Sequence, residues 1–184
     1  MNYQDRAFLP SLFPSNSTGA EIGVWDGVFA LEVMRSNPTR KLYLIDPFLH
    51  IEEFPQSAYG NKNIAQKDMD QKFAALKKKF KLEIKNGVIC LIRKTSTDAL
   101  NDIEDNSLDW VYIDGNHSYD YVLNDLKGYY NKVKKGGMIT GDDYGAIGWW
   151  DKGVTRAVDD FLALAKYKTN LFMIKNKQFV IKKL

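Results

Sequence analysis

Apolar runs of strand length alternate along the chain with longer stretches in which apolar residues recur at helical spacing. In the stretch 67–80, Met69, Phe73, Leu76 and Phe80 lie opposite a lysine-rich face, which predicts an amphipathic helix. Further helices are expected at 27–35, 119–133 and 153–167. Strands are expected at 19–25, 41–47, 88–93, 108–114 and 138–141. This alternation predicts an α/β fold with a doubly wound, mainly parallel sheet.

The end of the chain breaks this alternation. Apolar runs at 170–174 and 178–181 are separated by Lys175-Asn176-Lys177, which predicts a terminal hairpin. Added to the other strands, the hairpin gives a seven-stranded sheet with one antiparallel edge. The Lys-Lys-Gly-Gly run at 134–137 is expected to end the preceding helix as a glycine C-terminus.

Two segments belong to neither kind of element. Segment 1–18 holds Phe8, Leu9, Leu12 and Phe13 among prolines and serines, which predicts an N-terminal extension with a short apolar element that packs on the domain. Segment 49–66 is a polar, aromatic-containing insertion after the second strand, expected to lie over the ligand edge of the sheet. The whole chain, 1–184, is expected to form a single domain, since domains usually contain about 100–200 residues.

Composition narrows the class of protein. The net charge is +3, from 26 basic and 23 acidic residues, which is too small to argue for nucleic-acid binding. The lone cysteine, Cys90, lies in an apolar run, so it is interpreted as a buried small hydrophobe and no internal disulfide forms. No apolar run approaches the roughly 18 residues of a membrane span, and the N-terminus lacks a signal-peptide pattern. A cytoplasmic protein is expected.

Acidic residues end two of the predicted strands. Asp114 follows Val111 and Ile113, and the pair Asp142-Asp143 follows the strand at 138–141. Ligands of open α/β sheets bind outside the carboxyl ends of the strands. Clustered carboxylates repel one another unless a cation lies between them, and oxygen ligands suit Mg²⁺ or Ca²⁺. A metal site is therefore expected here, with His117 beside it. The alternatives are a turn role for Asp114 and a helix-capping role for the pair.

A glycine-bearing turn follows the first predicted strand. The segment Glu21-Ile-Gly-Val-Trp-Asp-Gly27 has the spacing E-x-G-x-x-x-G, which differs from the dinucleotide fingerprint and argues against a dehydrogenase. Glycine there lets a ligand approach the backbone, and the helix N-terminus offers free N–H groups. At the end of the second strand, Asp46 is placed to accept hydrogen bonds from a ribose diol. A capping role for Asp46 is the alternative.

These motifs, in this order, carry a resemblance that covers roughly 19–161. The chain resembles a class I S-adenosylmethionine-dependent methyltransferase, whose fold is Rossmann-like. It is most similar to the metal-dependent small-molecule O-methyltransferases, including the catechol-type and macrolide-sugar families. The motifs are Glu-Ile-Gly-Val-Trp-Asp-Gly, Leu-Ile-Asp-Pro-Phe, Thr-Ser-Thr-Asp-Ala-Leu, Tyr-Ile-Asp-Gly-Asn-His-Ser-Tyr, Gly-Gly-Met-Ile-Thr-Gly-Asp-Asp-Tyr and Gly-Val-Thr-Arg-Ala-Val-Asp-Asp-Phe.

The resemblance implies a role for each matching residue. Glu21 and Gly23 would border the methionine part of the cofactor, and Gly27 would start the helix beneath it. Three residues would contact the nucleoside: Asp46 at the ribose, Phe48 near the adenine and Ser96 at the adenine edge. The family's metal ligands match Asp114, Asp142 and Asp143, and Asp114 is also expected to serve the cofactor and the reaction. His117 occupies the spacing of the family's catalytic base.

The implied function is O-methylation of a small molecule such as a sugar or glycan precursor. A divalent ion, Mg²⁺ for example, would chelate two substrate oxygens, and His117 would accept the proton. Two alternatives stay open: methylation of nucleic acid, and a non-catalytic subunit that binds S-adenosylmethionine. Neither a membrane nor a nucleic acid is the expected partner, and a homo-oligomer is not excluded.

Overall fold

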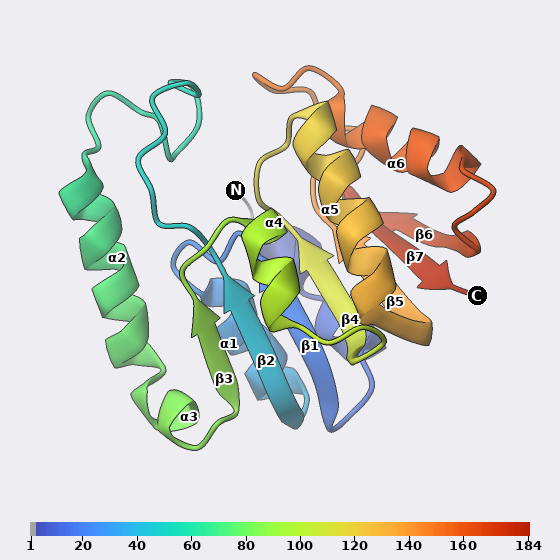
Figure 1. Cartoon of the computed structure of the whole chain (residues 1–184), viewed down its shortest axis with the longest axis horizontal. Coiled ribbons are helices and arrows are strands. Elements are labelled where there is room, and N and C mark those ends of the chain that lie inside the picture. The colour runs from blue at the N-terminus through green and yellow to red at the C-terminus, as the bar shows by residue number, and fades with distance from the viewer. Residues whose placement is uncertain (1–2) are drawn as a thin grey trace.

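A seven-stranded sheet forms the centre of the computed structural model, which describes residues 3–184 (Figure 1). The strand order is β3-β2-β1-β4-β5-β7-β6. The first five strands pair in parallel, and β7 is antiparallel to both of its neighbours. This confirms the predicted α/β fold class. The strands are β1 Ser17–Ile22, β2 Thr39–Ile45, β3 Ile89–Ile92, β4 Leu108–Ile113, β5 Val133–Gly141, β6 Thr169–Lys175 and β7 Gln178–Lys183.

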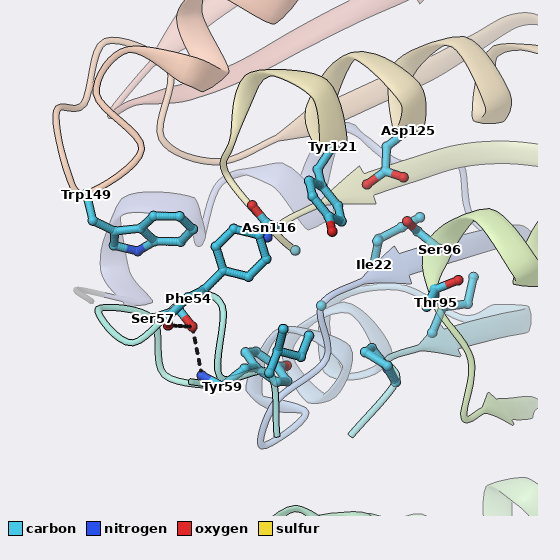
Figure 2. A pocket seen from close by; sticks show the side chains of 15 residues that line it. Ile22, Phe54, Ser57, Tyr59, Thr95, Ser96, Asn116, Tyr121, Asp125 and Trp149 are labelled. Atoms are coloured by element: carbon cyan, nitrogen blue, oxygen red, sulfur yellow. Dashed lines mark hydrogen bonds between the residues drawn. The ribbon is translucent and has the colours of Figure 1, made fainter. Parts of the chain in front are cut away.

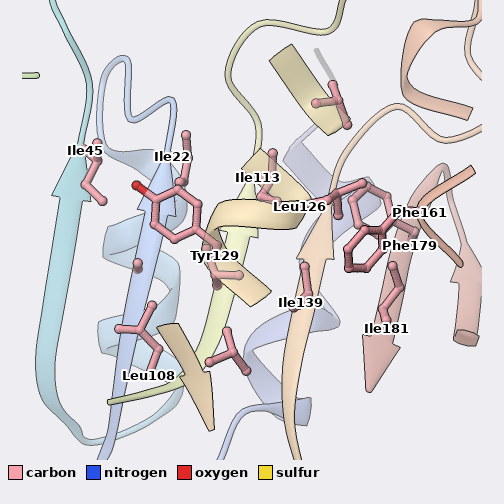
Figure 3. Packing of buried hydrophobic residues seen from close by; sticks show 14 of the residues in the cluster. Ile22, Ile45, Leu108, Ile113, Leu126, Tyr129, Ile139, Phe161, Phe179 and Ile181 are labelled. Atoms are coloured by element: carbon pink, nitrogen blue, oxygen red, sulfur yellow. The ribbon is translucent and has the colours of Figure 1, made fainter. Parts of the chain in front are cut away.

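Helices cover both faces of the sheet. They are α1 Val28–Ser36, α2 Gln66–Lys79, α3 Lys81–Lys85, α4 Ser96–Ala99, α5 Tyr119–Lys132 and α6 Gly153–Ala163, with short 3-10 helices η1 Tyr3–Arg6, η2 Leu9–Leu12 and η3 Leu100–Asp102. Successive side chains of β4 point to opposite faces, as the period of a strand requires. Val111 and Ile113 therefore join the core beneath α5 and α6 (Figure 3), whereas Trp110 and Tyr112 join the core beneath α1.

The N-terminal extension packs on this second core. Leu9 is fully buried, and the ring of Phe13 stacks on Trp110 with centroids 4.0 Å apart. The extension thereby brings Arg6 to the sheet. Within residues 3–184, no helix is both long and apolar enough to cross a membrane.

The strand register places the carboxyl ends of β1, β2, β4 and β5 level with one another. Ile22 at the end of β1 pairs with Ile45 of β2 and with Ile113 of β4, and Ile113 in turn pairs with Gly141 of β5. The residues that follow these four are therefore level with one another at one edge of the sheet. They are Gly23, Asp46, Asp114 and Asp142. The strand order also reverses between β1 and β4, and ligands of such sheets bind at this point.

Three predicted boundaries are wrong. The helix expected at 153–167 ends at Ala163, the strand expected at 19–25 ends at Ile22, and the boundary between α5 and β5 is misplaced. The Lys-Lys-Gly-Gly run does not end α5 as a glycine turn, because β5 already begins at Val133, which is buried and pairs with Leu108. Lys134 Nζ lies 2.5 Å from Asp109 Oδ1 of β4, and Gly136 has φ +79°. The strand accommodates the glycines as an irregularity in its pairing, so burial of Val133 outweighs the local turn signal.

Candidate active site

Close backbone contact joins the turn after β1 to the end of β4. Gly23 has φ +84°, and a Cβ at this position would lie 2.1 Å from the carbonyl oxygen of Asp114. Both the dihedral angle and the space therefore require glycine. Gly27, with φ +63°, precedes α1, and a side chain there would meet Leu76 and Phe80. The glycines that the sequence singled out are thus explained by this geometry.

Asp46 is fully buried at the end of β2 and accepts several hydrogen bonds. Its Oδ2 accepts from the backbone N–H groups of Val24 at 3.0 Å and Trp25 at 3.1 Å, and its Oδ1 accepts from Phe48 N–H at 2.8 Å. The Tyr59 hydroxyl also donates to Oδ2. Burial raises the pKa of Asp46, and these hydrogen bonds oppose that shift. Tyr59, from the insertion, was not predicted as a site residue.

Two adjoining cavities open at this edge of the sheet. The first lies over the strand ends and is lined in part by Ile22, Ile45, Pro47, Thr95, Ser96, Asn116 and Asp125 (Figure 2). Phe54 and Tyr59 of the insertion line it too. The second cavity is lined by Arg6, Asp114, His117, Asp143 and three tryptophans, Trp25, Trp149 and Trp150. Gly23, Gly115, Ser57, Tyr59 and Trp149 border both cavities.

An ion cluster lies in the second cavity. His117 Nε2 is 3.3 Å from Asp114 Oδ1, and His117 Nδ1 is 3.1 Å from Asp143 Oδ2. Burial lowers the pKa of His117, but the hydrogen bond and charge of Asp114, with the charges of Asp143 and Asp142, outweigh burial and hold this pKa above its ordinary value. The cluster therefore favours the protonated imidazole.

Arg6 completes the cluster from the N-terminal extension. Its Nη1 is 2.5 Å from Asp114 Oδ2 and donates to the Tyr112 hydroxyl at 3.1 Å. The side chains of Arg6 and Asp114 are 7% and 5% exposed, so this ion pair is almost fully buried. Sequence reasoning missed Arg6, because it lies 108 positions from its partner and has no motif around it.

The carboxylates do not fit a divalent ion as they lie. Among the described residues, no group of three or more His, Cys, Asp or Glu side chains is arranged to hold a metal. The predicted set, Asp114, Asp142 and Asp143, has other partners. Arg6 takes one oxygen of Asp114, His117 lies between Asp114 and Asp143, and Gln178 Nε2 donates to Asp142 Oδ1. Burial, followed by the charges of Asp114 and Asp143, raises the pKa of Asp142 to about 6.

The remaining predicted residues divide into two groups. Ser96 lines the first cavity, as expected for a residue at the adenine edge. Phe48 lines neither cavity, because the chain turns there with φ +46° and its buried ring packs against Phe73 at 5.4 Å. Glu21 is 2% exposed and also lines neither cavity, and burial raises its pKa well above the usual range. One oxygen of Glu21, Oε2, has no hydrogen-bond partner among the described residues.

Comparison with known proteins identifies the family. A family model for a methyltransferase domain matches residues 20–144, from β1 to the loop after β5. The chain belongs to this methyltransferase family. An uncharacterized protein of Acanthamoeba polyphaga mimivirus is 30% identical over 136 residues, which cover 72% of the methyltransferase and 53% of the viral protein. The methyltransferase thus spans about half the length of this relative.

Solved structures share the fold at low sequence identity. A candidate caffeoyl-CoA O-methyltransferase from Staphylococcus aureus has a TM-score of 0.69 at 14% identity, covering 100% of the methyltransferase and 85% of that chain. A candidate rRNA methylase from Clostridium thermocellum has a TM-score of 0.65 at 14% identity, with coverage of 98% and 94%. A Podospora anserina methyltransferase bound to S-adenosylhomocysteine has a TM-score of 0.59 at 16% identity, with coverage of 91% and 72%. The chain therefore combines a methyltransferase domain with the Rossmann-like fold of these solved structures.

Proposed function

We propose that this methyltransferase transfers the methyl group of S-adenosylmethionine to a hydroxyl of a small molecule in the second cavity, with His117 as the base. The position of His117 carries this proposal. Its ring lies in the second cavity next to Gly115, whose backbone borders the first cavity as well. A cofactor with its nucleoside in the first cavity would direct its sulfonium end toward this imidazole. Asp46 would hold the ribose, Gly23 would border the methionine part, and Ser96 would contact the adenine edge.

The reaction needs alignment and one proton acceptor. The step requires the neutral form of His117, so its rate should rise with pH as the imidazolium that the cluster favours loses its proton. The acceptor oxygen attacks the methyl carbon, the carbon–sulfur bond breaks to release S-adenosylhomocysteine, and the hydroxyl proton passes to the unprotonated ring nitrogen of His117. Alignment contributes up to about 7–11 kcal/mol, and a positioned base about 10²–10⁴-fold in rate. Asp114 and Asp143 lie beside the two ring nitrogens. These carboxylates would stabilise the imidazolium that forms when His117 takes the proton.

Aromatic rings support a sugar or another ring-bearing acceptor. Trp150 lies edge-to-face with His117 at 4.6 Å and with Trp149 at 5.7 Å, so the rings form a wall beside the base. The buried indole N–H of Trp150 has no acceptor among residues 3–184. A substrate oxygen would satisfy this donor, since buried polar groups are normally paired. A sugar or glycan precursor presents both the apolar ring face and the oxygens that such a wall fits.

Metal assistance is not part of the proposed mechanism, because Arg6, His117 and Gln178 already contact four of the six carboxylate oxygens of the expected ligand set. Methylation of nucleic acid is the alternative acceptor class. Likeness to an rRNA methylase supports it at the level of the fold, but no basic stripe interleaved with aromatic residues marks the sequence. A non-catalytic subunit would have no need of His117 beside the cofactor.

Binding and turnover test the proposal together. Calorimetry should show binding of S-adenosylhomocysteine and none of NAD. Transfer of a labelled methyl group should then be measured to sugars, nucleotide sugars, catechols and RNA fragments. We expect labelling of a hydroxyl compound that His117→Gln abolishes. Labelling of RNA alone, or transfer that is unchanged in His117→Gln, would contradict the proposal.

A further inference from the structure

An aspartate lies on the buried face of α5. Val122, Asp125, Leu126 and Tyr129 recur at helical spacing and are all buried, so Asp125 occupies a position that the periodicity assigns to an apolar residue. Asp125 is 4% exposed. Such a placement removes a carboxylate from water, and buried ionisable groups are retained where they are paired or functional.

The Asp125 carboxylate extends from α5 into the first cavity, on the side of Ser96 (Figure 2). Burial raises the pKa of Asp125, and the side chain of Ser96, which borders the same cavity, opposes this shift. No salt bridge within residues 3–184 includes Asp125, so its charge is not neutralised by a lysine or arginine. Each carboxylate oxygen accepts more than one hydrogen bond, which leaves capacity for a donor on a ligand.

The rest of the cavity suits a flat, apolar ring. Ile22, Ile45 and Pro47 supply apolar surface at the strand ends, and Phe54 and Tyr121 supply aromatic rings whose centroids are 5.8 Å apart. Thr95, Ser96 and Asp125 form a polar end of the same cavity. A planar heterocycle with a hydrogen-bond donor on its edge fits this distribution. In the cofactor of this family, that donor is the 6-amino group of adenine.

We propose that Asp125 is a specificity-determining residue that accepts a hydrogen bond from the 6-amino group of the cofactor adenine. The inference rests on the cofactor of the family and is independent of the acceptor proposed above. A cofactor with a 6-oxo group in place of the amine would set a carbonyl oxygen against the carboxylate. The comparison is therefore made above pH 8, where the Asp125 carboxyl is ionised. Two buried acceptors cannot pair there, so a site of this kind rejects the analogue strongly.

The test compares S-adenosylhomocysteine with S-inosylhomocysteine, which carries a 6-oxo group, by calorimetry. We expect the wild-type protein to prefer the adenine compound by about 100-fold, the size of a lost hydrogen bond to a charged group. Asp125→Asn should reduce this preference at least tenfold, because an amide presents both a donor and an acceptor. Asp120→Asn, on an exposed position of α5, is the matched control and should keep the wild-type preference.

If Asp125 has only a structural role, Asp125→Asn should weaken the binding of both compounds equally. The ratio of their affinities would then stay unchanged, which would overturn the proposal. A wild-type protein that binds both compounds equally would overturn it without any variant, even if Asp125→Asn did not fold. Failure of the wild type to bind S-adenosylhomocysteine would contradict the proposed cofactor as well. If the protein binds this compound but transfers a labelled methyl group to none of the acceptors tested, only the proposed acceptor class is contradicted.

Discussion

The Tyr59 hydroxyl donates a hydrogen bond to Asp46 Oδ2, the carboxylate expected to hold the ribose of the cofactor. Tyr59 comes from the insertion between β2 and α2, and it borders both cavities. Asp46 already accepts three backbone N–H groups. The phenol and a ribose hydroxyl would therefore compete for the same oxygen, and the cofactor would displace Tyr59 as it binds.

Tyr59→Phe should accordingly bind S-adenosylhomocysteine more tightly than the wild type. In the wild type, the cofactor must first break the hydrogen bond between Tyr59 and the Asp46 carboxylate, and a bond to a charged group is worth about 1.5–3 kcal/mol. The variant lacks this bond, so we expect its affinity for S-adenosylhomocysteine to be about tenfold higher. Calorimetry measures this change. Tyr121→Phe, in the same cavity, is the control for loss of a phenol. Weaker binding by Tyr59→Phe would show that the hydroxyl contacts the cofactor instead.

His117→Gln should slow methyl transfer by about 10²–10⁴-fold, the contribution of a positioned base. Its affinity for S-adenosylhomocysteine should stay within about twofold of the wild type, since no role in cofactor binding is expected for His117. Single-turnover rates with labelled cofactor separate the two effects. Equal losses of affinity and rate would assign His117 to binding.

Arg6→Met should destabilise the protein, because it removes one of the two cationic side chains, Arg6 and His117, that contact the buried Asp114. Removing one partner of a buried ion pair destabilises by about 3–5 kcal/mol. Urea unfolding measures the difference. Lys94→Met is the control, since the Lys94–Asp102 pair is largely exposed and should contribute at most about 1 kcal/mol. If Arg6→Met changes the free energy of unfolding only slightly, the N-terminal extension contributes little to stability through this ion pair.

Mn²⁺, followed by electron paramagnetic resonance, tests the metal hypothesis directly. With Arg6 on Asp114 and Gln178 on Asp142, we expect no saturable binding at millimolar Mn²⁺ and no effect of a chelator on methyl transfer. Binding at micromolar Mn²⁺ that Asp142→Ala abolishes would restore the three-carboxylate site.

Because Asp125 is buried, we expect the free energy of unfolding to depend on pH. Burial raises the pKa of Asp125 to about 7 from 3.8. Between these two pKa values, Asp125 is protonated in the folded protein but ionised in the unfolded chain. The stabilisation from this bound proton is therefore complete below pH 4, and it is lost as the pH rises through 7. The Ser96 side chain acts against the shift of the Asp125 pKa, and burial, followed by the charge of Asp125, raises the pKa of Tyr129. Asp125→Asn should lose this dependence and exceed the wild type by about 2–4 kcal/mol at pH 8, from 1.36 kcal/mol per unit of pKa.

Unfolding curves of both proteins at pH 5 and pH 8 provide the measurement. Glu21, Asp46 and Asp142 also have raised pKa values, but they are common to both proteins and cancel in the difference. A difference between the two proteins that does not change with pH would contradict the prediction. Greater stability of the variant, with loss of adenine preference, would show that the carboxylate is kept for binding.

Residues adjacent to strands were predictable, whereas contacts between distant segments were not. Asp46 and Asp114 follow strands, so the parallel register alone brings them to one edge. The pairing of Arg6 with Asp114 depends on how the extension packs, which no local pattern encodes. Tyr59 lies in a loop without periodicity. Asp125 could have been found, because it interrupts the apolar face of a predicted helix.

The resemblance to known enzymes predicted the methyltransferase family, which is confirmed, and it assigned cofactor residues that stay predictions. It also carried over a metal ligand set that these side chains do not form as they lie. Short motifs preserve the positions of the carboxylates, but they do not specify their partners. Here Arg6 comes from a segment before the first motif, so the motifs contain no information about it.

The contact between Gly23 and the backbone of Asp114 has a consequence for how this protein can change over evolution. It ties the turn after β1 to the end of β4, which leads to the proposed base His117, on the rigid sheet. Much of the aromatic wall of the second cavity comes instead from loops, with Tyr59 in the insertion and Trp149 and Trp150 after β5. New acceptors can therefore arise by exchange of loop residues, while the geometry of methyl transfer is inherited unchanged.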